Sequence, residues 1–499
     1  MVAVDQPAPA AHRARSPFLV AGLLTVAAAV VLAALAVSSI AADDQIRWGA
    51  VALAAFCCGL LMLMSVAAGH DRLGLAHWRL GPWSLVWGAF AFGLATISWI
   101  GSQAGPSGEI WPGSILRALV MIAVALGCLT AGYCAGPHRL AVARARRLTD
   151  RLSRRYTDDI RGPAVPWLLL GVGLVSQFGF AVLTGHFGYV GDVEASVTTA
   201  SGYSQYLAVA GQCVPMALMA AAMRAYRTRT PEAWLAVAVI FAATIAEGAV
   251  AGGKASFVVA ILAVSIPHTL ARRRLPVAAI VAAILAFLLV VIPFNEAYRA
   301  SARGPVALST SQAVATAPAI ARQVIASDLS LAILGDSASF LAQRIRTIDS
   351  PAIIMQRTPA QIPYASPVQL LASPVIGLVP RILWPGKPIL TPGYQISQEY
   401  FQLPPQIYTS SDVTPEGDLY RHGGWPPLIA GMFLLGALLR IIDETTDLRR
   451  SAHGAFLILL LFPDTVQAGS DCATLLAGIP GMTLLWLCLI TTSFTPRRR

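Results

Sequence analysis

The 499-residue chain is 56% hydrophobic and only 12% charged, about half the charged fraction of a typical soluble protein. Its net charge of +11 comes from basic residues gathered between apolar runs. No zinc-ligand spacing or aromatic and basic face accompanies them, which argues against nucleic-acid binding. The composition excludes an ordinary soluble domain and predicts an all-α, polytopic membrane helix bundle.

The apolar residues recur in runs of roughly 17–24, the length that a helix needs to cross about 30 Å of hydrocarbon. Because lipid offers the backbone no hydrogen-bond partners, each run must be helical. The first run is too long for a typical signal-peptide core, so we expect it to remain as a membrane anchor. We predict about twelve spans, near 18–40, 47–68, 82–100, 115–135, 165–184, 206–223, 233–250, 255–271, 276–294, 426–442, 454–469 and 473–494.

The basic residues predict the orientation of these spans. Most of them fall on one side if both termini are cytoplasmic, above all in the loop at 137–162. This gives a nine-span bundle at 1–294, a large extracytoplasmic loop at 295–425 and a three-span bundle at 426–499. We expect amphipathic helices at 320–348 in the large loop. The stretch at 368–383 is broken by prolines and predicts an interfacial or re-entrant element.

Two polar features sit at the predicted outer ends of the spans. Lys254, one of only two lysines, follows two glycines in a tight turn. It is either a functional cation or a lysine that snorkels to the interface. Tyr298 and Arg299 follow the ninth span, where an arginine either binds a lipid-linked phosphate through paired hydrogen bonds or anchors the helix end.

The sequence VPRILWPGKP at 379–388 holds two cations in a proline-stiffened segment. Arg381 and Lys387, the second lysine, are suited to a pyrophosphate, and Trp384 between them suits a headgroup or a sugar ring. The sequence TPEGDLYRHGGW at 414–425 precedes the tenth span. Its carboxylates and histidine are the residue types of general-base catalysis, although acidic and basic neighbours can also simply pair and cap a helix.

These two segments, with about 25 residues between them and a final group of spans behind, resemble the Wzy-type O-antigen polymerases, also called oligosaccharide repeat-unit polymerases. The resemblance implies a membrane-embedded glycosyltransferase of the GT-C kind. Such an enzyme joins oligosaccharide units linked to undecaprenyl pyrophosphate on the outer face of the bacterial plasma membrane. The lipid-linked glycan is transferred to an acceptor sugar hydroxyl.

The resemblance also implies roles for particular residues and partners. Candidate catalytic residues are Arg299, Arg381, Glu416 and Asp418; candidate substrate-binding residues are Lys254, Tyr298, Trp384, Lys387, Tyr420, Arg421 and His422. No cofactor or metal is expected, because the lipid pyrophosphate is itself the activated leaving group. Expected partners are the lipid-linked oligosaccharide, membrane lipids, a flippase and a chain-length regulator.

Two other functions fit the same sequence. A ligase would move finished glycan to a different acceptor. A transporter or flippase of lipid-linked sugars would place ionisable groups near the middle of its spans. The predicted spans are nearly free of charge at their centres, while polar residues crowd the outer loop, which favours chemistry at the membrane surface.

Overall fold

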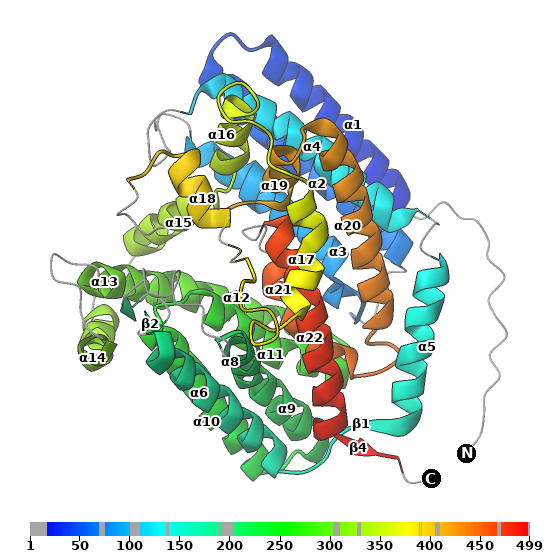
Figure 1. Cartoon of the computed structure of the whole chain (residues 1–499), viewed down its shortest axis with the longest axis vertical. Coiled ribbons are helices and arrows are strands. Elements are labelled where there is room, and N and C mark those ends of the chain that lie inside the picture. Colours follow the sequence, from blue (N-terminus) through cyan, green and yellow to red (C-terminus); the bar gives the residue numbers. More distant parts are fainter. Residues whose placement is uncertain are drawn as a thin grey trace.

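The computed structural model describes residues 17–68, 75–99, 110–135, 139–184, 186–187, 190–191, 204–302, 310–326, 331–388, 390, 392–404, 410–466 and 471–497. Most of this part is helical, and it contains eleven helices that are long and apolar enough to cross a membrane. Figure 1 shows these helices packed side by side. The chain is therefore an all-α, multi-pass membrane protein, as its composition predicts.

Eight of the eleven spans are single helices and three are composite. The single helices are α1 (Pro17–Ser38), α2 (Ala42–Ala68), α4 (Pro112–Cys134), α6 (Ala164–Thr184), α10 (Pro231–Val250), α11 (Ala255–Arg272), α20 (Trp425–Thr445) and α22 (Cys472–Ser493). The composite spans are α3 (Leu80–Gly88) with η2 (Ala89–Gly93) and η3 (Leu94–Trp99); α8 (Ser204–Gly211) with α9 (Cys213–Thr228); and α12 (Val277–Ala286) with η4 (Phe287–Val291) and α13 (Ile292–Ala302). The segments η2 and η4 are π-helical turns, a feature often found at functional sites.

The segment at 454–469, expected to be a full-length span, forms a shorter helix within the described residues. Its described part forms α21 (Gly454–Val466), a helix of 13 residues. Such a helix is about 20 Å long, shorter than the eleven spans. Residues from Gly454 to Phe462 are all buried, so α21 packs inside the protein. Its apolar composition reflects contact with other helices, and composition alone cannot distinguish that from contact with lipid.

Shorter elements cover the ends of the bundle. They are η1 (Leu75–Trp78), α5 (Arg139–Arg155), α14 (Thr310–Ala326), α15 (Leu331–Ile345), α16 (Asp349–Arg357), α17 (Val368–Leu378), α18 (Pro392–Glu399) and α19 (Pro415–Arg421), with strands β1 (Tyr156–Ile160), β2 (His186–Phe187), β3 (Val190–Gly191) and β4 (Phe494–Pro496). Figure 1 places α15, α16 and α18 on one side of the bundle and α5, β1 and β4 on the opposite side. We call these the loop end and the arginine end.

Short helices occupy the two stretches of the large loop for which we expected amphipathic helices and an interfacial or re-entrant element. The stretch at 320–348 holds the end of α14 and all of α15. The stretch at 368–383 forms α17, which ends at Leu378, before Pro380. This helix lies against α22, and Gly377 meets the backbone of Ala477 so closely that a side chain there would collide with it.

The arginine end is held by a buried carboxylate that sequence reasoning missed. Both carboxylate oxygens of Asp443 accept hydrogen bonds from the first backbone N–H groups of α3, from Leu80 at 2.7 Å and from Gly81 at 3.1 Å. The hydroxyl of Tyr133 donates to the same carboxylate at 2.8 Å. A negative charge at a helix N-terminus is stabilised by the helix dipole, so Asp443 fixes α3 and α4 to α20.

Glu444, the next residue, links α20 to α5 and to the residue before α3 through ion pairs. Its carboxylate pairs with Arg79 at 3.2 Å, with Arg440 at 2.8 Å and with Arg146 of α5. The arginine end also contains a two-stranded antiparallel sheet, in which β1 pairs with β4. Arginines near the ends of membrane helices are usually attributed to topology, and here several of them also bind buried acids.

Candidate functional site

The short helix α19 is wholly buried at the loop end of the bundle. Thr414 caps it, because its hydroxyl accepts a hydrogen bond from the backbone N–H of Gly417 at 3.1 Å, and Pro415 occupies the first helical position. Gly423 and Gly424, with φ of 140° and 77°, turn the chain from α19 into α20. The motif at 414–425 therefore forms a capped, buried helix followed by a sharp turn.

Asp418 is the centre of the polar contacts on α19. Its side chain is fully buried, and its Oδ1 accepts a hydrogen bond from Nη2 of Arg421 at 2.9 Å. Oδ2 accepts from the backbone N–H of Ala473 at 3.3 Å, in the first turn of α22. The predicted acidic and basic neighbours thus do pair, and the pair also joins α19 to α22.

His422 is brought to the same carboxylate. Its Nδ1 lies 2.7 Å from the carbonyl oxygen of Asp418 and 3.4 Å from Oδ1 of that residue. A carbonyl oxygen can only accept a hydrogen bond, so Nδ1 carries a proton, and in the neutral form of this ring Nε2 is the acceptor. Nε2 is buried and has no hydrogen-bond partner within the described ranges. An oriented imidazole with an open acceptor nitrogen has the geometry of a general base.

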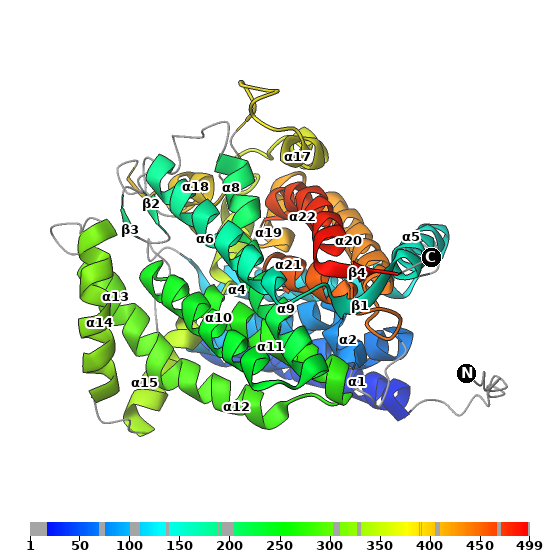
Figure 2. The same cartoon turned by 90° about the horizontal axis from the view of Figure 1, so that it is seen from below.

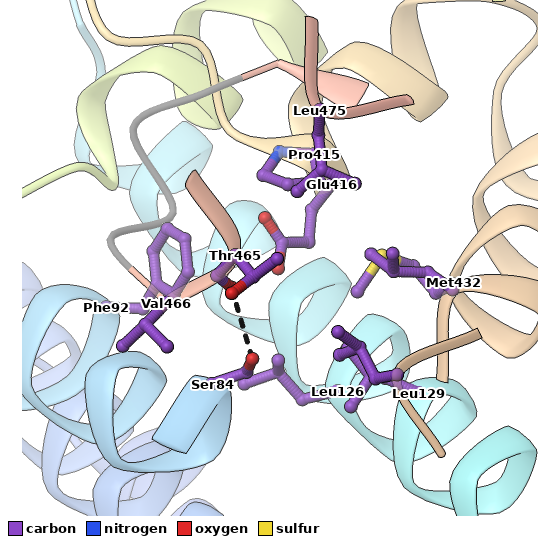
Figure 3. A pocket seen from close by; sticks show the side chains of 12 residues that line it. Ser84, Phe92, Leu126, Leu129, Pro415, Glu416, Met432, Thr465, Val466 and Leu475 are labelled. Carbon is purple, nitrogen blue, oxygen red and sulfur yellow. Dashed lines mark hydrogen bonds between the residues drawn. The ribbon is translucent and has the colours of Figure 1, made fainter. Parts of the chain in front are cut away.

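Glu416 points away from this pair, into the interior of the bundle. Figure 3 shows its side chain directed into a small cavity beside Thr465, Met432 and Leu129. The cavity has a volume of about 20 Å³, room for one water molecule, and its lining is mostly apolar. Burial raises the pKa of Glu416 to about 7. Its Oε2 has no hydrogen-bond partner among the residues described.

Tyr420 lies in the last turn of α19, just before the turn at Gly423 and Gly424. Its ring packs edge-on against Trp425, with 6.1 Å between the ring centroids. Burial raises the pKa of Tyr420, and the neighbouring Tyr364 adds to this effect. Tyr364 also closes over Gly424, where an added side chain would meet its hydroxyl. The two tyrosines and Trp425 therefore form an aromatic rim beside the buried polar group.

Lys254, Tyr298 and Arg299 form a second group at the loop end. The guanidinium of Arg299 donates two hydrogen bonds to the carbonyl oxygen of Gly252, from Nε at 3.1 Å and from Nη2 at 2.8 Å. The hydroxyl of Tyr298 donates to the carbonyl of Val250 at 2.8 Å. The predicted turn and the predicted helix end, far apart in the sequence, are thus in direct contact.

Lys254 is enclosed by this contact. Its Nζ is shielded from solvent, lies 4.4 Å from the centre of the Phe340 ring, and has no hydrogen-bond partner in the described part of the chain. Burial and the nearby guanidinium groups of Arg299 and Arg344 together lower the pKa of Lys254 to about 8, and the carboxylate of Glu296 partly opposes them. Three cations from three segments therefore gather at one place, which we call the cation cluster.

Arg344 was not among the predicted site residues. It lies one turn after Phe340 on α15, in a stretch whose apolar face was the only signal in the sequence. It also lies near Asp412, which precedes the cap of α19. The segment that leads into α19 therefore passes beside the cation cluster.

The loop at 379–388 stands apart from both groups. Figures 1 and 2 show it beyond the end of α17, away from α19 and from α13. Arg381 donates to the carbonyls of Pro385 and Pro388 at 3.3 and 3.4 Å, and Lys387 donates to the carbonyl of Val379 at 3.0 Å. Burial and the nearby Arg381 lower the pKa of Lys387. The two cations are close together as predicted, but they help to hold the fold of their own loop.

Trp384, between these two cations, is partly exposed on the same loop. The predicted residues therefore fall into three groups, on the loop at 379–388, around Lys254 and on α19. Within the described ranges, no three His, Cys, Asp or Glu side chains are close enough to hold a metal ion.

The fold defines a multi-pass membrane protein, and the three groups of predicted site residues lie on one large inter-span segment and on the elements next to it. Residues 188–450, just over half of the chain, match the family described as a domain of unknown function (DUF8712). The chain belongs to this family, and the match includes all three groups of predicted site residues. No curated protein and no solved structure matches the chain.

Proposed function

We propose that this protein is a polymerase that joins oligosaccharide repeat units carried on undecaprenyl pyrophosphate, at the outer face of the bacterial plasma membrane. The observation that carries the proposal is the cation cluster of Lys254, Arg299 and Arg344 at the loop end, where the shielded ammonium of Lys254 lacks a hydrogen-bond partner in the described ranges. Three cations outnumber the two carboxylates near them, Glu296 beside Lys254 and Asp412 beside Arg344, and an excess of positive charge favours a polyanion such as a diphosphate.

The reaction follows from the chemistry of such a donor. The acceptor hydroxyl oxygen attacks the anomeric carbon of the lipid-linked sugar, and the bond from that carbon to the pyrophosphate oxygen breaks. The lipid pyrophosphate leaves with the bonding electron pair, and the cation cluster stabilises its growing charge. Binding energy aimed at that charge lowers the barrier, because the charge is greater in the transition state than in the donor.

The hydroxyl proton needs an acceptor, and His422, directly after α19, is the best oriented candidate in the motif at 414–425. Its Nδ1–H is fixed by Asp418, so Nε2 is left to accept a proton. Asp418 then balances the imidazolium that forms. Glu416 is less suited, because its carboxyl faces a small interior cavity. Asp412, which lies near Arg344, precedes the cap of α19, so this segment leads from the cation cluster to α19.

The test is chain growth by the purified protein in detergent, with lipid-linked repeat units as the only substrate. We expect long glycan from the natural protein and at least about tenfold less from Arg299→Ala and Lys254→Ala. Arg322→Ala is the matched control, because Arg322 is exposed on α14 and bonds the Pro318 carbonyl of its own helix. Equal chain growth by the natural protein and all three variants would show that the cation cluster does not contribute to the reaction.

The same assay separates the rival functions. Detergent contains no sealed compartment, so growth in detergent excludes transport as the essential activity. A ligase would consume the donor only when a different acceptor is added. If repeat units alone give no chain growth, but glycan is transferred once another acceptor is added, the protein is a ligase and not a polymerase.

A further inference from the structure

An apolar slot lies directly beside the cation cluster. It lies between α10, α11, the η4–α13 region and α14, and has a volume of about 300 Å³. All of its lining side chains are apolar: Ile245, Ala246, Ala249, Val250, Phe257, Val290, Val291, Phe294, Ala317, Pro318, Ala321 and Val324. A slot of this size and composition suits a hydrocarbon chain.

The slot and the cations share the same backbone elements. Val250 and Phe257 line the slot on either side of the turn that carries Lys254. Phe294 lines it from α13, and Arg299 lies just over one helical turn further along that helix. The bonds from Tyr298 and Arg299 to this turn close the joint between α13 and the α10–α11 turn. An occupant of the slot therefore has its end beside Lys254 and Arg299.

The other side of the slot opens onto the apolar surface of the bundle. Ala246 and Pro318 are exposed at its rim. Beyond the rim, large apolar side chains of α10 and α12 are exposed, among them Leu235, Val239, Val281 and Ile284. Such a surface faces lipid in a membrane protein. The slot thus connects the lipid-facing surface to a cationic site.

The π-helical turn η4 contributes to the shape of the slot. Val290 and Val291 belong to this turn and line the slot. On the other wall, α14 presents the small side chains of Ala317 and Ala321. A wide turn faced by alanines leaves room that ordinary close packing would fill. Filling this room with a large side chain is therefore a direct test of its use.

We infer that this slot holds the first part of the polyprenyl chain of the lipid-linked donor, with the diphosphate on Lys254 and Arg299. The inference rests on the proposed function for its donor, and it adds where the lipid binds. A hydrocarbon tail joined to a compact polyanion matches both the apolar lining and the charge at its end. The larger groove of about 460 Å³ between α1, α2 and α4 is also apolar. Among the described residues, its lining includes one polar side chain, that of Gln45, and no cation that could bind a diphosphate.

The experiment uses the full chain in detergent and geranylgeranyl diphosphate that carries a diazirine at the end of its tail. After illumination, mass spectrometry locates the labelled peptides. We expect label on α10 and α14, and about tenfold less in Ala321→Trp and in Ala246→Trp. Ala246 is exposed at the rim, where a tryptophan disturbs packing less, so Ala246→Trp still tests the slot if Ala321→Trp does not fold. Ala33→Trp, in the groove of α1, α2 and α4, is the matched control.

Competitors identify which part of the probe is recognised. Unlabelled geranylgeranyl diphosphate should prevent labelling, whereas inorganic pyrophosphate, geranylgeraniol and phosphatidylglycerol at equal concentration should prevent it much less. Equal competition by phosphatidylglycerol would make the slot a general lipid site and overturn the inference. Unchanged labelling in both filled-slot variants, or label confined to other helices, would also overturn it.

The outcomes separate this inference from the proposed function. Labelling of the slot without chain growth by the natural protein would keep the lipid site and reject the polymerase. Chain growth by the natural protein that persists undiminished in both filled-slot variants would keep the polymerase and reject the slot.

Discussion

Arg299 donates two hydrogen bonds from its guanidinium to the carbonyl oxygen of Gly252. These two bonds fix the end of α13 to the turn that carries Lys254, so Arg299 and Lys254 are held near each other although their charges repel. A planar group with paired donors can do this, and a lysine cannot reproduce both bonds. The position of the cation cluster therefore depends on the shape of one side chain as well as on its charge.

Arg299→Lys and Arg299→Ala should separate charge from geometry. We expect Arg299→Lys to keep part of the affinity for geranylgeranyl diphosphate, and Arg299→Ala to weaken binding at least about tenfold, since charged hydrogen bonds contribute about 1.5–3 kcal/mol each. Binding is measured by titration of the labelled probe. The control is Arg322→Ala, which should bind like the natural protein. Natural affinity in Arg299→Ala would show that this guanidinium does not contribute.

Binding of the diphosphate should weaken as the pH rises past about 8. The pKa of Lys254 is lowered to about 8, so the ammonium is charged below that pH and neutral above it. Phosphate groups, with a second pKa near 6, keep their charge over this range. Lys254→Arg should remove the pH dependence between 7 and 9, because arginine stays protonated. An identical pH profile in natural protein and variant would exclude Lys254 as the titrating group.

Chain growth should depend on the open acceptor nitrogen of His422. His422→Asn and His422→Gln remove a base, and loss of a general base typically costs about 10²–10⁴ in rate. Binding of the labelled probe should change little, because His422 lies outside the cation cluster. The comparison of rate with binding is the readout that distinguishes a base from a packing residue. Parallel loss of both would assign His422 to structure.

The pair of Asp418 and Arg421 should be strongly coupled in stability. Both side chains are buried, at 0% and 6% relative exposure, so Asp418→Ala leaves a buried guanidinium without its carboxylate. We expect destabilisation of about 3–5 kcal/mol, seen as a lower melting temperature in detergent, with part of it recovered in the double variant Asp418→Ala/Arg421→Ala. Asp159→Ala breaks the exposed pair with Arg227 and should change stability by less than about 1 kcal/mol.

Glu416→Gln should alter how stability depends on pH. Burial raises the pKa of Glu416 from 4.5 to about 7, so the folded protein holds the proton more tightly than the unfolded chain. Stability from this proton is complete below about pH 4.5 and is lost as the pH rises through about 7, a change of roughly 3 kcal/mol. Glutamine cannot ionise, so the variant should be more stable than the natural protein at pH 8. Equal melting curves at pH 5 and 8 in the natural protein would contradict this.

The sequence predicted the membrane spans well, because one physical constraint governs them. Hydrocarbon requires long apolar helices, and eleven of the twelve expected spans have that length. The exception is α21, where Phe456 and Leu459 are apolar because they contact protein. Composition responds to both environments in the same way, so length measured in the folded chain was needed to separate them.

The candidate site was predicted in parts and not as a whole. The contact of Arg299 with the turn before Lys254 is between residues 47 apart in sequence, and no local pattern encodes it. The segment holding Arg381 looked like the strongest cation site, yet its donors reach carbonyls of their own loop. Arg344 gave no signal, because a single arginine on an amphipathic helix is ordinary.

Pairing of β1 with β4 has a consequence for biosynthesis. The two strands leave the ribosome far apart in time, since β1 follows α5 and β4 follows α22. Until Phe494 emerges, the β1 edge has no partner from β4, and the early and late helices are not yet joined at this point. A nascent chain that stops short of Phe494 therefore presents an open strand edge, which can pair with another chain until β4 closes the sheet.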